Sequence, residues 1–196
     1  MADLARLIAL LHDIGRFEQL KRYDSFEPGT MDHAAYGVKV LFDEGMIRRF
    51  LPDDKWDSII YTAIAHHSDY ELPEISDPQT LLHAKLIRDE DKLDNCRVKL
   101  VDSTSTFINV SEEELGTQNI TQKVYETVFK NKCILSADRV TQMDYWVSYI
   151  VYFFDINFKE SFDIIAENDY LNRIIDRIPY SNPVTKEQME NIRVYM

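Results

Sequence analysis

The histidines of this chain, and the acidic residues expected to point inward with them, are its best candidates for chemistry. All five histidines lie within the first 83 of the 196 residues. His12 and Asp13 close a segment, ADLARLIALL, that is apolar on almost every helical face and is therefore expected to be buried. A carboxylate placed there is costly unless it is paired, and a divalent cation is the strongest partner available. The alternative is an ion pair between Asp13 and Arg16, with His12 as a hydrogen-bonded core residue.

Helical spacing directs a second histidine inward. Ile60, Ala63, Ile64 and His67 follow the spacing i, i+3, i+4, i+7, so His67 is expected to face the core. His66 is rotated from that stripe by about 100°, nearer to the flank of the helix. Taken alone, an inward histidine is more often a hydrogen-bonded core residue than a metal ligand.

His33 and Asp91 extend the candidate set. His33 begins an expected helix over residues 33–44. Ala84, Ile87 and Asp91 are spaced i, i+3, i+7, which makes Asp91 the carboxylate expected to point inward from the charged run 88–94. The rest of that run is predicted to be a solvated acidic face.

Imidazoles and carboxylates from several helices form a site suited to Mn, Fe, Co, Ni, Zn or Mg. Helical bundles build such sites from the inward-facing side chains of facing helices. We therefore expect one or two divalent metal ions as cofactors.

Helices must position these residues, because apolar residues follow helical spacing nearly everywhere and no strand-like alternation persists. The fold class predicted is all-α. Gly15 is predicted to end the first helix, residues 101–111 to form a loop or seam, and a capping box at Thr185 to open the last helix. Other helices are predicted over residues 55–67, 77–95, 120–128, 139–154, 158–166 and 169–178, and one beginning at Ser111. The aromatic residues within 139–154 are expected to pack the C-terminal helices onto the metal core rather than to form a stacking platform for bases.

Composition excludes several classes of protein. Lys and Arg number 22 against 34 Asp and Glu, a net charge of −12, which disfavours binding to duplex nucleic acid or an anionic membrane. Two cysteines cannot form a disulfide framework, no signal peptide is apparent, and no apolar run is long enough to cross a bilayer. A cytoplasmic location is predicted. P-loop, GxGxxG, GxSxG and HExxH motifs are absent from the sequence.

Four segments resemble the HD-domain superfamily of metal-dependent phosphohydrolases. They are LLHDIGRFEQ (10–19), DHAAYG (32–37), AIAHHSDYELP (63–73) and IRDEDKLDN (87–95), in the order of that family. The resemblance covers about residues 4–95. It implies an HD-domain-like helical bundle with additional C-terminal helices. Residues 1–100 would form the metal-binding core, and residues 101–196 a helical extension packed on the same domain.

The resemblance also implies roles for individual residues. His12, Asp13 and Asp91 match the ligands of one metal, and His33 and His67 match the extra histidines of members with two metals. The family's first histidine is not matched, because only eleven residues precede His12 and none is a histidine. This predicts either a start upstream of Met1 or a degenerate member.

The activity implied is hydrolysis of a small phosphomonoester or phosphodiester, with nucleotides among the candidates. Asp13 and Arg16 would be catalytic. Arg16 would be the first choice for a phosphate contact and Lys92 the second, with solvated surface cations as the alternative for both. A homo-oligomer is left open. Two other functions are compatible with these residues: a non-catalytic regulatory or binding module, and a di-iron oxygenase.

Overall fold

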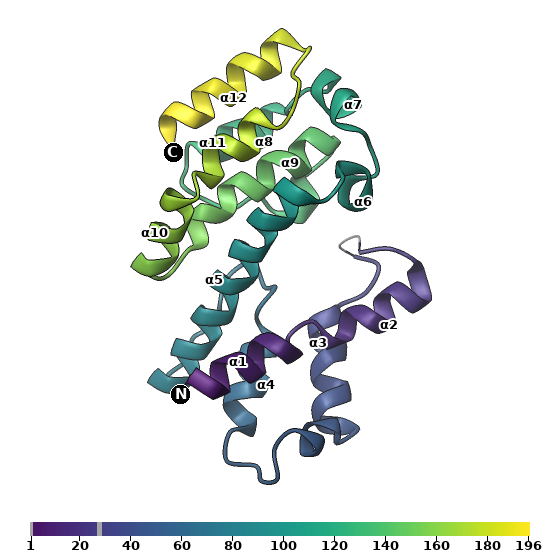
Figure 1. The fold of residues 1–196 in the computed structure, drawn as a ribbon, viewed down its shortest axis with the longest axis vertical. Coiled ribbons are helices and arrows are strands. Elements are labelled where there is room, and N and C mark those ends of the chain that lie inside the picture. The colour runs from purple at the N-terminus through teal and green to yellow at the C-terminus, as the bar shows by residue number, and fades with distance from the viewer. Residues whose placement is uncertain (1, 27–28) are drawn as a thin grey trace. The chain divides into compact units, whose positions relative to one another are not determined.

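The chain is all-α, as its sequence predicts. A computed structural model describes residues 2–26 and 29–196, and within these residues helices follow one another with no strand (Figure 1). They form two compact units, residues 1–91 and 92–196, each with its own apolar core. In the same described part of the chain, no helix has both the length and the apolar character needed to span a membrane.

The first unit brings the ends of two helices together over a small apolar core. Leu4, Ile8 and Leu11 of the first helix share this core with Ile60 and Ile64. The residues that follow these two helices, which include the predicted ligands, therefore meet at one end of the core. In chain order the elements of this unit are α1 (Ala2–Leu11), α2 (Ile14–Tyr23), α3 (His33–Val38), a π-helical segment (Lys39–Asp43), a 3₁₀ turn (Met46–Arg49), α4 (Asp57–Ala65) and the first part of α5 (Pro78–Val101).

Helices α2 and α3 approach each other closely at Gly15. A Cβ atom on Gly15 would collide with the carbonyl oxygen of His33, whereas one on Gly37 would meet Ile14 Cγ2 at an ordinary 3.4 Å. The prediction that Gly15 ends the first helix is wrong, because α1 ends at Leu11 and Gly15 lies inside α2. Gly15 has no side chain because the start of α2 packs directly against the first turn of α3.

The second unit is organised around the buried indole of Trp146, against which Phe107 stacks with ring centroids 6.3 Å apart. The aromatic run within residues 139–154 thus belongs to the core of this unit itself. Its elements are the end of α5, α6 (Thr104–Ile108), α7 (Glu112–Thr117), α8 (Gln122–Val128), a 3₁₀ turn (Ser136–Asp138), α9 (Gln142–Ile150), a 3₁₀ segment (Val151–Asp155), α10 (Lys159–Glu167), α11 (Tyr170–Asp176) and α12 (Pro183–Tyr195).

Two local predictions for this unit are corrected. The Ser/Thr-rich stretch 101–111 is not simply a loop, because it contains the short helix α6. The last helix begins at Pro183 with Asn182 as its cap, not at Thr185. Thr185 is fully buried instead, and its hydroxyl donates to the carbonyl of Gln118 at 2.7 Å. The Thr185 hydroxyl therefore makes a tertiary hydrogen bond instead of the capping hydrogen bond that the sequence predicted.

Candidate metal centre

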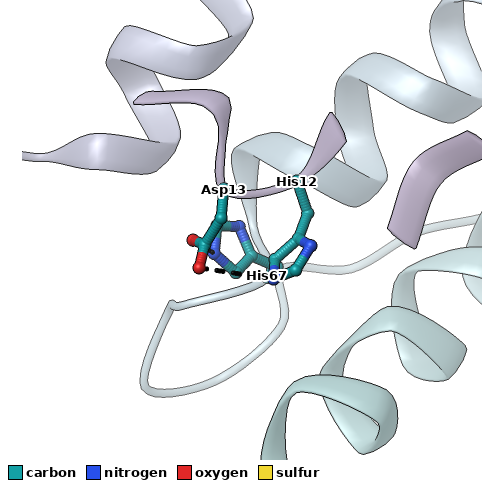
Figure 2. Close-up of side chains that lie close together, drawn as sticks. All are labelled: His12, Asp13 and His67. Carbon is teal, nitrogen blue, oxygen red and sulfur yellow. Dashed lines mark ion pairs between the residues drawn. The ribbon is translucent and has the colours of Figure 1, made fainter. Parts of the chain in front are cut away.

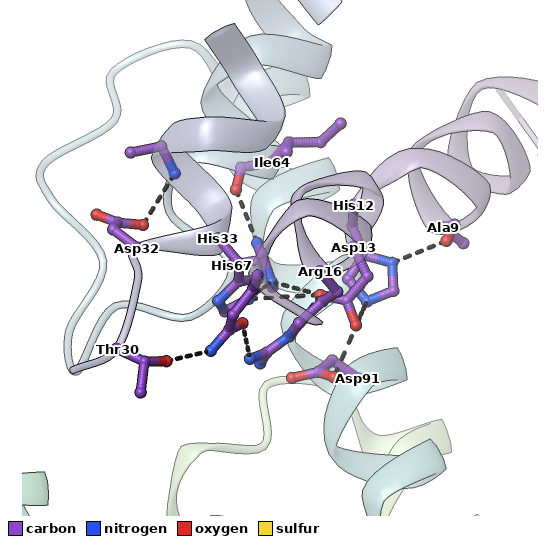
Figure 3. Close-up of polar contacts among 12 residues, drawn as sticks. Ala9, His12, Asp13, Arg16, Thr30, Asp32, His33, Ile64, His67 and Asp91 are labelled. Carbon is purple, nitrogen blue, oxygen red and sulfur yellow. Dashed lines mark hydrogen bonds and ion pairs between the residues drawn. The ribbon is translucent and has the colours of Figure 1, made fainter. Parts of the chain in front are cut away.

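His12 is the first residue after α1, and that helix orients its ring. Ring atom Nδ1 lies 2.8 Å from the carbonyl oxygen of Ala9 (Figure 3). A carbonyl only accepts hydrogen bonds, so Nδ1 carries the proton and the neutral ring presents an unprotonated Nε2. That Nε2 faces two carboxylates, at 3.6 Å from Asp13 Oδ2 and 3.9 Å from Asp91 Oδ1.

His67 follows α4 and is oriented in the same way. Its Nδ1 lies 2.7 Å from the carbonyl oxygen of Ile64, which again leaves Nε2 as the unprotonated nitrogen. The ring is buried, with its centroid 5.1 Å from that of His12. His66 is partly exposed instead, and its Nδ1 lies 2.6 Å from Asp69. The prediction from helical spacing that His67 faces the core, and His66 the flank, is confirmed.

The carboxylate of Asp13 lies among these imidazoles, and its two oxygens face different ones (Figure 2). Oδ2 faces His12 at 3.6 Å, whereas Oδ1 lies 3.4 Å from His33 Nε2 and 3.5 Å from His67 Nε2. Oδ1 is buried and accepts no hydrogen bond from the described residues. Arg16 Nε lies 3.4 Å from this oxygen, so the Asp13–Arg16 ion pair offered as the alternative is present, and a bound cation would further compensate the charge of the carboxylate.

His33 is placed by the first turn of α3, which Asp32 caps by accepting the N–H of Ala35 at 2.9 Å. Its Nε2 lies only 3.0 Å from Nε2 of His67. When His67 is neutral with its proton on Nδ1, its Nε2 is an acceptor and the Nε2–H of His33 is the donor across this gap. The two nitrogens could otherwise bind the same cation.

The spacing of these atoms fits divalent metal ions. Nitrogen and oxygen ligands lie about 2.0–2.2 Å from zinc, so neighbouring ligand atoms are roughly 2.8–3.6 Å apart. Five pairs of nitrogen and oxygen atoms in this cluster are 3.0–3.9 Å apart, and one ligand atom from each of His12, Asp13 and His67 lies within 4.8 Å of the others. One group could form from His12, Asp13 and Asp91, and a second from Asp13, His33 and His67. Asp13 belongs to both.

The two predicted phosphate contacts lie in different surroundings. Arg16 is at the cluster, with Nε 3.4 Å from Asp13 Oδ1, and its side chain is 31% exposed. Lys92 belongs to the second unit, where its Nζ lies 2.8 Å from Asp155 Oδ2 with the side chain only 9% exposed. Arg16 therefore lies beside a candidate ligand, and Lys92 is paired with a carboxylate of its own unit.

Arg88 is a contributor that sequence reasoning missed. The charged run 88–94 was expected to be largely solvated, but Arg88 and Asp89 are buried. The guanidinium of Arg88 donates from Nη1 to the carbonyls of Asp69 at 2.6 Å and His67 at 3.3 Å. It therefore ties α5, which carries Asp91, to the backbone at His67. The available signal was its position four residues after the buried Ala84, on the same face of the helix.

The surroundings of Asp13 and His33 favour their deprotonated forms. Burial opposes ionisation of Asp13, but the positive charges that Arg16 carries, and that His67 and His12 carry when protonated, outweigh it and hold the pKa of the carboxyl below its usual range. Burial also lowers the pKa of His33 from 6.5 to about 4, and the positive charge of Arg16 acts in the same direction. Deprotonated carboxylates and neutral imidazoles are the forms that bind metals.

The shift at His33 predicts a pH-dependent stability for the metal-free protein. In the unfolded chain His33 takes up a proton near pH 6.5, whereas in the folded chain it does so only near pH 4. The contribution of His33 to the free energy of unfolding is therefore fully present above pH 6.5. As the pH falls towards 4, this contribution decreases by about 3 kcal/mol. Urea unfolding in EDTA at pH 7 and pH 4 measures this loss, and His33→Gln should lose about 3 kcal/mol less than the wild type over that range. Equal losses in the two proteins would contradict the assignment.

Comparison with known proteins gives one match. A family model described as HD domain matches residues 1–96, the part of the chain that contains every candidate ligand. No curated protein and no solved structure matches the chain. HD domains typically bind divalent metals, which agrees with the cluster of histidine and aspartate side chains around Asp13.

Proposed function

The chain belongs to the HD-domain family through its residues 1–96, and on that premise we propose that it is a metal-dependent phosphohydrolase. Its substrate would be a small phosphomonoester or phosphodiester, with nucleotides among the candidates. The observation that carries the proposal is the carboxylate of Asp13, whose two oxygens face separate imidazoles and one of which is buried without a hydrogen bond.

Each residue of the cluster has a role in this proposal. His12, Asp13 and Asp91 would hold one divalent ion, and Asp13, His33 and His67 a second. Mn, Fe, Co, Ni, Zn and Mg are the candidates. Bound ions of this kind supply a water of lowered pKa and polarise phosphoryl oxygens. The hydrogen bonds from His12 to Ala9 and from His67 to Ile64 orient the two rings so that each Nε2 would face a bound ion. The rings therefore would not need to reorient when a metal binds.

Arg16 would bind the phosphate group. A guanidinium can donate two parallel hydrogen bonds to phosphate oxygens, and it stays charged at any physiological pH. Its partial exposure and its proximity to Asp13 support this role. The pairing of Lys92 with Asp155 favours Arg16 over Lys92 as the phosphate contact.

The direct test measures metal content and hydrolysis in the same preparation. Protein stripped with EDTA is reloaded with each candidate metal and assayed on a panel of phosphomonoesters, phosphodiesters and nucleotides. Release of phosphate or nucleoside that depends on the metal is the expected result. No metal uptake and no turnover would indicate the binding module, whereas iron uptake with substrate-triggered oxygen consumption would indicate the oxygenase.

Two adjacent histidines provide a matched pair of variants. His67→Gln removes an inward ring nitrogen and should lower both metal affinity and kcat/KM by more than about 100-fold, because even outer-shell partners of a metal cost 10–100-fold. His66→Gln removes a partly exposed ring that pairs with Asp69, and should change either quantity by less than about twofold. Isothermal titration with Mn²⁺ and steady-state kinetics measure the two effects. Equal effects of the two variants would refute the assignment of His67.

A further inference from the structure

Gln19 of α2 is a fully buried polar residue whose amide is bonded at both ends. Its Oε1 accepts a hydrogen bond from Arg16 Nη1 at 2.9 Å, and its Nε2 donates to Thr30 Oγ1 at 2.8 Å. Figure 3 shows Arg16 and Thr30 at the two ends of this chain of hydrogen bonds. Reversing the amide would place a donor against a donor at Arg16, so only one orientation of Gln19 satisfies both partners.

Gln19 in turn restrains Arg16. The guanidinium is planar and rigid, and two contacts on different atoms fix its plane: Nη1 on Gln19 and Nε beside Asp13 Oδ1. An arginine tethered only to Asp13 could rotate about that single contact. Holding a binding group in one orientation before the ligand arrives lowers the entropy lost on binding.

We propose that Gln19 is a positioning residue that holds the guanidinium of Arg16 in the orientation that binds a phosphate group beside the metal cluster, with Thr30 anchoring Gln19. This inference rests on the proposed function, from which the phosphate ligand is taken. Gln19 acts through Arg16, to which its Oε1 is bonded.

The test measures binding of inorganic phosphate to the Mn²⁺-loaded full chain by isothermal titration calorimetry. Arg16→Met and Gln19→Met should each weaken phosphate binding by about tenfold, the typical effect of losing a hydrogen bond to a charged group. The double variant should bind phosphate no more weakly than Arg16→Met alone, because Gln19 has nothing left to position. The affinity for Mn²⁺ should stay within about twofold of the wild type in Gln19→Met.

Two further variants sharpen the result. Thr30→Val keeps the shape of the side chain, removes the acceptor for the Gln19 amide, and should weaken phosphate binding by about threefold. It tests the same chain of hydrogen bonds without placing an apolar group at position 19. Gln122→Met removes a glutamine that bonds the exposed Glu126 in the second unit, and should leave phosphate binding unchanged.

Three outcomes with the variants would overturn the inference. They are an unchanged phosphate affinity in Gln19→Met, additive losses in the double variant, and a parallel loss of Mn²⁺ affinity, which would indicate a general structural role. Absence of phosphate binding to the loaded wild type would also overturn it. Ester hydrolysis is measured separately. If the effects of Arg16→Met and Gln19→Met on phosphate affinity are non-additive but no ester is hydrolysed, the role of Gln19 is upheld and the proposed function is rejected.

Discussion

Asp13→Asn should abolish metal-dependent hydrolysis and lower metal affinity by more than about 100-fold. The substitution keeps the size of the side chain but replaces one carboxylate oxygen by an amide nitrogen and removes the charge. Because the two oxygens of Asp13 face separate groups of imidazoles, both predicted metal positions should lose a ligand. Loss of a direct ligand should exceed the 10–100-fold effect of outer-shell partners. Metal content after dialysis and kcat/KM on the best substrate of the panel measure the change.

Asp69→Asn is the matched control for this prediction. Asp69 also pairs with a histidine, His66, but lies outside the cluster and is 45% exposed at its side chain. Its substitution should leave metal content unchanged and kcat/KM within about twofold. If Asp13→Asn retained wild-type metal content, or if both variants lost it equally, the placement of the metal centre around Asp13 would be wrong.

Gly15→Ala should lower the free energy of unfolding by about 3 kcal/mol. The new methyl group would collide with the carbonyl oxygen of His33, which is backbone and cannot rotate away, so α2 and α3 must separate. Overpacking of this kind costs about 1–3 kcal/mol and occasionally more. The substitution lies between Asp13 and His33, so metal affinity should fall together with stability. Urea unfolding followed by circular dichroism measures the first effect, and titration with Mn²⁺ the second.

Gly37→Ala tests whether the effect comes from the collision or from loss of a helical glycine. Gly37 faces the same contact from α3, but its added methyl group would sit at ordinary van der Waals distances, with Ile14 Cγ2 at 3.4 Å and the Gly15 nitrogen at 3.5 Å. Alanine favours the helix over glycine by about 1 kcal/mol, so this variant should be neutral or slightly more stable. Similar destabilisation by both substitutions would contradict the close approach at Gly15.

Helical periodicity predicted much of what the structure contains. Ile60, Ala63 and Ile64 of α4 are buried, because a side chain's direction on a helix follows from its position in the turn. His67, just after the end of α4, is buried as well, whereas His66 is partly exposed. The caps at Asp32 and Ser111 were readable for a similar reason, since a cap contacts backbone only three residues away. Such contacts are local, so they can be predicted from the sequence.

Local signals failed where a distant partner competed for the same residue. Gly15 resembled a helix terminus but serves a close contact with His33 in another helix. Thr185 resembled a cap but bonds the carbonyl of Gln118. Arg88 resembled part of a solvated face but binds carbonyls near His67. In each case the partner is separated by more than a dozen residues, so no local pattern records it.

The sequence by itself placed imidazoles and carboxylates at the ends or on the inward faces of helices, and its motifs identified the family. Only the tertiary structure decided that the two oxygens of Asp13 face different imidazoles, that carbonyls fix the rings of His12 and His67, and that Gln19 reaches Arg16 and Thr30 together. The physical reason is that residue type and helical phase give the direction of a side chain from its own axis. The distance between two side chains on different helices depends on how closely the backbones pack, and here that depends on single atoms such as the missing Cβ of Gly15.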